Sequence, residues 1–215
     1  MPIARSCVCR VFGDLSGTRL MVVGILLAAG AGQRFGGGKL LAEMANGQCI
    51  AEVACRALIP AVDRLIAVVR RGDEALAARL AACGAEICVA VDAQRGMGAS
   101  LAAGVAQAPD GDGWLIALGD MPLVASTDST RVADALRGGA LIVVPVADGR
   151  RGHPVGFAPR FLPDLLALSG DAGARALLSK YSAEVVEIPV GDARRWCDVD
   201  TSDDLAVARA LFKQS

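Results

Sequence analysis

Short apolar runs alternate with segments of helical periodicity along most of the chain. The apolar runs predict buried strands at residues 22–27, 65–69, 86–91, 114–118, 141–144, 154–157 and 185–190. The periodic segments predict helices at residues 50–58, 73–83, 98–107, 126–136, 159–168, 172–178 and 202–212. Gly84 is the expected end of the second helix, and Ser126 or Thr127 the expected N-cap of the fourth. This order of elements predicts right-handed βαβ crossovers and an α/β fold, a three-layer sandwich with a mostly parallel, Rossmann-like sheet.

The two ends of the chain depart from this regular alternation. Residues 1–20 contain no continuous apolar stretch, so we expect an N-terminal extension that is poorly ordered, or a start of translation at Met21. Residues 21–215 contain no repeat, low-complexity tract or long linker, which predicts a single domain. The alternation is regular over residues 21–148 and looser over residues 149–215, so we expect these two halves of the domain to differ in role.

Composition and charge narrow the class of protein. Hydrophobic residues make up 53% of the 215 residues and aromatic residues only 4%, as expected for helices packed on a buried parallel sheet. The net charge is −1 and the basic residues are scattered, which argues against nucleic acid as a partner. No apolar run reaches the roughly 18 residues that span a bilayer, so we expect no membrane association. The seven cysteines include no Cys-x-x-Cys pair and are typical of reduced thiols, which favours a cytoplasmic location.

A glycine-rich loop, LAAGAGQRFGGGK at residues 27–39, directly follows the first predicted strand. A triphosphate needs backbone N–H groups that it can approach closely and at least one cation. The glycines provide the open backbone, and Arg34 and Lys39 provide the charge. We therefore predict a nucleotide site that includes Leu27, Ala28, Ala29, Gly30, Gly32 and Lys39.

Other kinds of glycine-rich loop fit less well. A P-loop requires glycine where this chain has Gln33, and Ser or Thr where it has Leu40. A dinucleotide fingerprint requires glycine at Phe35, which weakens the interpretation as a dinucleotide-dependent oxidoreductase without eliminating it. A flexible surface loop without a ligand is a further alternative.

Acidic residues lie where a magnesium ion bound to the triphosphate would need them. Asp120 follows a predicted strand, so its carboxylate is expected at the carboxyl edge of the sheet. Magnesium takes one or two carboxylates together with phosphate oxygens, and Asp200 is the expected partner of Asp120, with Asp198 behind it. The alternatives are a turn role for Asp120 and capping of the last helix by Asp200 or Thr201.

The loop resembles the Leu-Ala-x-Gly-x-x-x-Arg-x-Gly-x-x-Lys signature of the MobA-like nucleotidyltransferases. Further segments resemble the same family in the same order: GMGASL at 96–101, GDMP at 119–122, GRRGHPV at 149–155, and DVDT at 198–201 followed by DDL at 203–205. GDAGAR at 170–175 is similar to a segment of the branch that makes molybdopterin cytosine dinucleotide. The resemblance covers residues 22–212 and implies a fold of the nucleotide-diphospho-sugar transferase type.

The resemblance implies a magnesium-dependent transfer of CMP from CTP to the phosphate of the molybdenum cofactor, molybdopterin, with release of pyrophosphate; manganese is an alternative metal. Ala29 stands where guanylyltransferases of the family usually have glycine, which favours the cytidine branch. Gly98 and Ala99 stand where cytidylyltransferases commonly have hydroxyl residues, so Ser100 is left as the candidate for a hydroxyl contact to the nucleotide. A molybdoenzyme or its chaperone is the partner expected to receive the product.

The nucleotide half, residues 21–148, is expected to hold the groups that act on the phosphates. Lys39 and Arg34, with the metal ion, would stabilise charge on the departing pyrophosphate, and Asp120 would complete the catalytic set. Arg70 and Asp92 follow predicted strands and are expected near the base or ribose.

The acceptor half, residues 149–215, is expected to receive the pterin. By itself, His153 is typical of an ordinary hydrogen-bonded loop residue. The resemblance, and the neighbouring cations Arg150 and Arg151, favour a site for the pterin phosphate. Asp171 is expected either to touch the pterin or to cap the helix that follows it.

Three other functions stay open at this point. One is a guanylyltransferase, or a nucleotidyltransferase of the same fold that acts on another phosphorylated acceptor such as a sugar phosphate. Another is a nucleotide-binding regulatory module without turnover, against which Lys39, Asp120 and Asp200 argue. The third is the dinucleotide-dependent oxidoreductase already considered.

Overall fold

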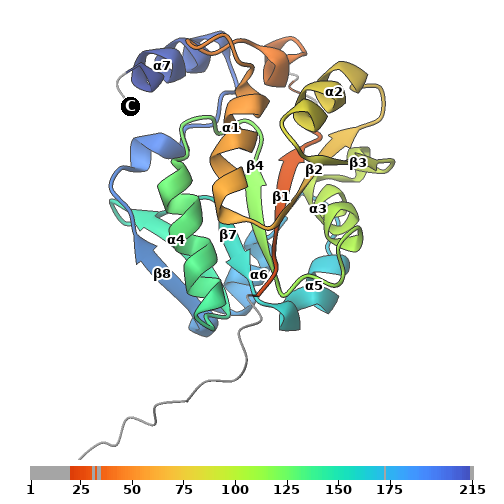
Figure 1. The fold of residues 1–215 in the computed structure, drawn as a ribbon, viewed down its shortest axis with the longest axis vertical. Coiled ribbons are helices and arrows are strands. Elements are labelled where there is room, and N and C mark those ends of the chain that lie inside the picture. Colours follow the sequence, from red (N-terminus) through yellow and green to blue (C-terminus); the bar gives the residue numbers. More distant parts are fainter. Residues whose placement is uncertain (1–19, 31, 33–34, 172, 214–215) are drawn as a thin grey trace, which may run out of the picture.

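A computed structural model describes residues 20–30, 32, 35–171 and 173–213, and their helices and strands form the predicted three-layer α/β sandwich (Figure 1). The N-terminal extension expected for residues 1–20 lies outside the described residues except for Leu20. The central sheet is continuous from the first described strand to the last, so it includes strands from both predicted halves of the domain.

The sheet contains eight strands in the order β3-β2-β1-β4-β7-β5-β6, with β8 paired to β5 on its other side. The strands are β1 (Val22–Ala28), β2 (Arg64–Arg70), β3 (Glu86–Ala90), β4 (Gly113–Leu118), β5 (Ile142–Ala147), β6 (Arg150–Arg151), β7 (Val155–Phe157) and β8 (Val185–Pro189). Neighbours among β1 to β4 are parallel, whereas β7 runs antiparallel to both β4 and β5. The prediction of a mostly parallel sheet is confirmed, and the short strand β6 is an addition that the sequence pattern did not predict.

Helices cover both faces of this sheet. They are α1 (Ile50–Leu58), α2 (Glu74–Ala82), α3 (Met97–Ala106), α4 (Ser126–Arg137), α5 (Leu162–Leu166), α6 (Arg175–Lys180) and α7 (Ser202–Phe212). One apolar core lies between the sheet and α1, α2, α4 and α7, and a second lies between the sheet and α3, α5 and α6. Figure 1 shows α1 and α4 on one side of the central strands and α3 and α5 on the other.

Strand β1 shows why both faces of the strands must be apolar. Val22 and Leu26 pack in the first core, whereas Val23 and Ile25 pack in the second. Alternate side chains of a strand point to opposite faces, so a strand covered by helices on both sides reads as a continuous apolar run. Burial of β1 on both faces accounts for the continuous apolar run from which this strand was predicted.

Helix ends agree only in part with the local signals. Gly84 has φ = +95° and follows the last turn of α2, as predicted for a glycine that ends a helix. The N-cap predicted at Ser126 or Thr127 is wrong, because α4 begins at Ser126 after Ala125, and no side chain caps it. At α7, Thr201 and Asp204 form a capping box, in which the Thr201 hydroxyl accepts from the backbone N–H of Asp204 at 3.2 Å.

None of the described helices combines the length and the apolar character that a membrane crossing requires. The cysteines within the described residues are free thiols: Cys49, Cys55, Cys83, Cys88 and Cys197. Burial raises the pKa of the Cys49 thiol to about 11, which keeps it in its neutral form and fits a packing role in the core.

Gly104 packs closely against the sheet, and its replacement by alanine tests the packing of α3. A methyl group there would lie 2.6 Å from Cγ2 of Val68 and 2.9 Å from Cγ2 of Ile25. Overpacking costs about 1–3 kcal/mol, whereas alanine gains only about 0.5–1 kcal/mol over glycine within a helix. We therefore expect Gly104→Ala to lower the free energy of unfolding in urea. Gly191→Ala is the matched control, because nothing lies within 4 Å of its added methyl group; equal stability of the two variants would contradict the close packing.

Candidate active site

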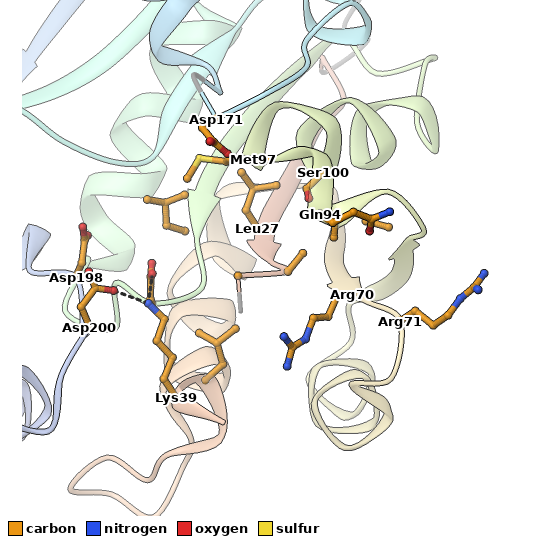
Figure 2. A pocket seen from close by; sticks show the side chains of 18 of the residues that line it. Leu27, Lys39, Arg70, Arg71, Gln94, Met97, Ser100, Asp171, Asp198 and Asp200 are labelled. Carbon is orange, nitrogen blue, oxygen red and sulfur yellow. Dashed lines mark hydrogen bonds and ion pairs between the residues drawn. The ribbon is translucent and has the colours of Figure 1, made fainter. Parts of the chain in front are cut away.

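A cleft of about 610 Å³ lies at the carboxyl ends of β1, β2, β3 and β4 (Figure 2). Parallel α/β sheets bind their ligands at this edge, because the loops that leave the strands diverge there. The glycine-rich loop leaves β1 and brings Gly30 and Lys39 to the cleft, and Asp120 enters it two residues after β4. Asp198 and Asp200 enter from the segment before α7.

Lys39 connects these segments. Its Nζ donates hydrogen bonds to Oδ2 of Asp120 and to Oδ1 of Asp200, both at 2.8 Å. Gly38, with φ = +66°, leads into the short 3-10 helix η2 (Lys39–Leu41) that carries the lysine, and Lys39 is only 7% exposed. A buried ammonium requires such partners, since an unpaired charge in this position would be very costly.

The charges at this end of the cleft are strongly coupled. Burial opposes the charged form of Lys39, but the hydrogen bonds and negative charges of Asp120 and Asp200 outweigh it and raise the pKa of the ammonium. At Asp198, burial and then the neighbouring charges of Asp120 and Asp200 raise the pKa of the carboxyl. Four ionisable side chains therefore share one small volume beside the glycine-rich loop.

Backbone hydrogen bonds fix the two carboxylates that hold Lys39. The N–H of Gly119 donates to the Leu27 carbonyl at 2.9 Å, which aligns the end of β4 with the end of β1. The N–H of Val199 donates to the Asp120 carbonyl at 3.0 Å and brings the segment before α7 alongside. The sequence left open whether Asp200 or Thr201 caps the last helix. Thr201 is the N-cap of α7, whereas the Asp200 side chain accepts a hydrogen bond from Lys39.

These residues fit a divalent cation that brings some of its own ligands. Oxygen atoms of Asp120 and Asp200 converge on one point, where the ammonium now lies. Within the described part of the chain, no group of three or more His, Cys, Asp or Glu side chains is arranged to hold a metal ion. Magnesium commonly takes one or two carboxylates and completes its shell with water and phosphate oxygens, so the pair suits a metal–nucleotide site better than a closed metal cage.

The opposite end of the cleft joins α3 to the segment between α5 and α6. The N–H of Gly98 donates to the Gly170 carbonyl at 2.7 Å, and a methyl group at Gly98 would lie 2.8 Å from the Ser169 carbonyl oxygen. This close approach places Asp171 beside Met97, as Figure 2 shows. Asp171 does not cap the next helix, because α6 begins at Arg175 with Ala174 as its N-cap.

Arginines line the side of the cleft that faces α2. Arg70, the last residue of β2, is held by Asp73 through hydrogen bonds of 2.7 and 3.2 Å. In Figure 2 its side chain extends on the same side as Lys39, whereas that of Arg71, which also lines the cleft, extends in the opposite direction. Ser100, buried in the first turn of α3, lines the cleft near Gln94.

The predicted acceptor segment lies at the same edge of the sheet but does not line the cleft. His153 lies with Nδ1 3.4 Å from the Ile116 carbonyl oxygen, and burial lowers the pKa of its imidazole. Arg151 is turned toward β8, where its Nε donates to Oε1 of Glu187 at 2.8 Å. Arg150 is exposed on β6.

Most of the predicted site residues come together in the cleft: Leu27, Ala29, Gly30, Lys39, Arg70, Ser100, Asp120, Asp171, Asp198 and Asp200. Gly32 borders a smaller hollow of about 30 Å³ beside it, which Lys39 and Arg70 also line. Ala28 is buried in the first core, Asp92 is exposed near Arg95, and Arg34 lies outside the described residues.

The cleft also contains residues that the sequence interpretation did not assign to the site: Leu40, Arg71, Ala90, Val91, Ala93, Gln94, Gly96, Met97 and Leu118. The rule that ligands bind beyond the strand ends would have found Arg71 and Val91, which follow β2 and β3. Nothing in the sequence around Gln94 predicts that it belongs to the site. It reaches the cleft only because the segment between β3 and α3 turns toward it.

A comparison with known protein families identifies the class to which this fold and this cleft belong. The model of the MobA-like NTP transferase domain matches residues 24–185. The chain therefore belongs to the MobA-like NTP transferase family, and its fold is of the nucleotide-diphospho-sugar transferase type.

Individual relatives extend the comparison. The chain is 32% identical over 192 residues to a protein named nicotine blue oxidoreductase from Paenarthrobacter nicotinovorans, covering 86% of this chain and 94% of the relative. The crystal structure of Rv0371c from Mycobacterium tuberculosis H37Rv is similar with a TM-score of 0.80 and 30% identity, covering 90% of this chain and 99% of the other. A structure of Rv0371c in complex with manganese is similar with a TM-score of 0.74 and 27% identity, covering 88% and 98%.

The contact between Gly152 and Trp196 links the predicted acceptor segment to the segment that carries Asp198 and Asp200, and it can be tested by a double-mutant cycle. A methyl group at Gly152 would overlap the indole ring of Trp196, so we expect Gly152→Ala to lower the free energy of unfolding by about 1–3 kcal/mol.

The second arm of the cycle uses Trp196→Phe, which provides a smaller ring. The indole N–H is buried and makes no hydrogen bond with the described residues, so phenylalanine removes bulk without breaking one. In this background we expect Gly152→Ala to cost at least about 0.5 kcal/mol less, measured by urea denaturation. Additive effects of the two substitutions would show that the ring does not limit this position.

Proposed function

We propose that the protein transfers CMP from CTP to the phosphate of molybdenum-loaded molybdopterin. In this reaction an oxygen of the acceptor phosphate forms a bond to the α-phosphorus of CTP, the bond from that phosphorus to the bridging oxygen breaks, and pyrophosphate leaves. The observation that carries the proposal is the ammonium of Lys39 between Asp120 and Asp200, beside a glycine-rich loop. Nucleotidyl transfer depends on positioning and on neutralising charge, and this group of residues supplies both.

The phosphates would lie against the glycine-rich loop. Gly30 and Gly32 leave the backbone open to them, while Lys39 and Arg34 would neutralise the departing pyrophosphate. A magnesium ion, or manganese in its place, held by Asp120 and Asp200 with Asp198 near, would polarise the α-phosphate when bound.

The nucleoside would occupy the part of the cleft bounded by β1, β2 and α3. Leu27 and Ala29 form its edge at the end of β1, and Ser100 offers a hydroxyl group from α3, whereas the buried Ala28 packs in the core behind them. Arg70 would face the ribose or the phosphates, and the more exposed Asp92 would act only at the rim. The choice of CTP rests on the resemblance at Ala29, and GTP is the alternative.

The acceptor would enter from the side of Asp171 and of the segment 149–155. Asp171 lies in the cleft and would accept hydrogen bonds from the pterin ring, whereas His153, Arg150 and Arg151 would receive its phosphate. Arg151 must first leave Glu187 for this role. We also propose a cytoplasmic location and transfer of the product to a molybdoenzyme or its chaperone.

A second candidate function follows from the relative that is named an oxidoreductase. In that case the cleft would hold a dinucleotide, and the acidic residues around Lys39 would have no metal to bind. Oxidation of reduced nicotinamide, followed by its absorbance, distinguishes this function from nucleotidyl transfer.

The deciding experiment supplies magnesium, each nucleoside triphosphate in turn and molybdenum-loaded molybdopterin, and measures pyrophosphate and the dinucleotide product. We expect release that requires both CTP and the pterin. Release with GTP alone would overturn the cytidine assignment, and release that requires a sugar phosphate would replace the acceptor.

Lys39→Ala is expected to lower the rate of pyrophosphate release on the order of 100- to 1,000-fold, the usual effect of removing a group that stabilises transition-state charge. Lys180→Ala is the matched control, because Lys180 lies in α6 and pairs with Asp164 at 2.7 Å, outside the cleft. Near-normal turnover in the Lys39 variant would exclude it from the catalytic set.

The acceptor role of Arg151 can be tested by substituting either Arg151 or its ion-pair partner Glu187. We expect Arg151→Ala to raise the KM for the pterin and leave kcat nearly unchanged, because it removes a charge that binds the phosphate. Glu187→Gln, which frees the guanidinium, is expected to lower this KM. Arg160→Ala, at another surface ion pair, is the control. An unchanged KM in both Arg151 and Glu187 variants would remove Arg151 from the acceptor site.

A further inference from the structure

We propose that the Lys39 ammonium closes the metal site until the nucleotide binds, so that the protein takes up its nucleotide as the metal–triphosphate chelate and binds little free metal beforehand. This inference rests on the proposed metal-dependent transfer. It concerns the order in which the ligands bind and the residue that couples them.

The geometry of the ion pairs carries the first step. The oxygens that would hold the metal, Asp120 Oδ2 and Asp200 Oδ1, each lie 2.8 Å from the Lys39 nitrogen. A magnesium ion needs oxygen ligands at about 2.0–2.1 Å, so an ion bound by both carboxylates would stand in the place of the ammonium. Two cations cannot share that place, and one must leave before the other enters.

The lysine and its two partners differ in their exposure to solvent. The Lys39 side chain is 8% exposed, whereas those of Asp120 and Asp200 are 26% and 39% exposed. The two carboxylates are therefore more open to solvent than the lysine that they hold. A bare divalent ion would have to displace a buried lysine without bringing an anion to pair with its ammonium.

A triphosphate changes this balance because it offers the ammonium another partner. The Lys39 side chain also borders the hollow of about 30 Å³ beside the glycine-rich loop, together with Gly30, Gly32 and Arg70. Lysine has a flexible stem that can turn its charge from one hollow to the other. Phosphate oxygens at the loop would draw the ammonium away, and Asp120 and Asp200 would then hold the metal that the same phosphates bring.

The ligand set is consistent with such an exchange. Among the described residues no group of three or more metal-ligating side chains is arranged to hold an ion, so water and the phosphate oxygens of the nucleotide would complete the shell of the metal. Metal and nucleotide are therefore expected to bind with positive coupling. Because coupled binding is reciprocal, each ligand raises the affinity of the protein for the other by the same factor. Lys39 is the residue that sets this factor.

The test measures Mn²⁺ binding by electron paramagnetic resonance, with and without α,β-methylene-CTP, which binds but is not cleaved at the α–β position. A solution of Mn²⁺ and the analogue without protein is the reference. For the wild-type protein we expect Mn²⁺ to bind at least about tenfold more tightly with the analogue than without it. In Lys39→Met, which keeps the stem and removes the charge, we expect Mn²⁺ alone to bind at least about tenfold more tightly than in the wild type.

Lys180→Met is the control for removing a lysine charge outside the cleft, and it should bind Mn²⁺ as the wild type does. Equal affinity of Lys39→Met and the wild type for Mn²⁺ alone would overturn the inference. The inference would also be overturned if the analogue did not change the affinity of the wild-type protein for Mn²⁺. This measurement needs no variant, so it decides the question even if Lys39→Met fails to fold. If CMP transfer is observed in either of these cases, only the inference fails. Absence of Mn²⁺ binding under every condition would remove the proposed metal-dependent transfer as well.

Discussion

The Lys39 ammonium lies between two carboxylates that stand 81 and 161 residues further along the chain. Burial of this charge is possible only while both partners are in place, so the glycine-rich loop, the end of β4 and the start of α7 must come together at one point. The backbone bonds from Gly119 to Leu27 and from Val199 to Asp120 hold the same three segments in register. The acidic end of the cleft is therefore a structural junction as well as a candidate site, which explains why its charges are so closely packed.

Two glycines determine how closely segments that are distant in sequence approach one another. Gly152 allows the Trp196 ring to lie against the segment 149–155, and Gly98 allows residues 169 and 170 to lie against the first turn of α3. A side chain at either position would separate elements that are distant in sequence. The contact at Gly98 joins the nucleotide half to the acceptor half beside Asp171, so the shape of that end of the cleft depends on a residue that carries no side-chain chemistry of its own.

Much of the fold follows from periodicity, since strands covered on both faces read as apolar runs and the helices between them as amphipathic segments. The position of Asp120 at the cleft follows in the same way, because a residue after a parallel strand lies at the ligand-binding edge. The pairing of Lys39 with Asp120 and Asp200 could not be predicted, because it depends on three distant segments. Nor could the turn of Arg151 toward Glu187, which depends on β8 lying beside β5. The capping signal at Ser126 failed because hydroxyl residues also occur within the first turn of a helix.

The order β1-β4-β7 explains why the two halves of the chain meet at Asp120. Strand β4 lies between β1, which leads into the glycine-rich loop, and β7, which the segment 149–155 precedes. Because β7 is antiparallel to β4, its first residue lies at the edge where β4 ends; a parallel strand in its place would begin at the opposite edge. An in-line displacement requires the attacking group and the leaving group on opposite sides of the phosphorus. The strand that breaks the parallel pattern thus places the Asp120 carboxylate between the glycine-rich loop on one side and the predicted acceptor segment on the other.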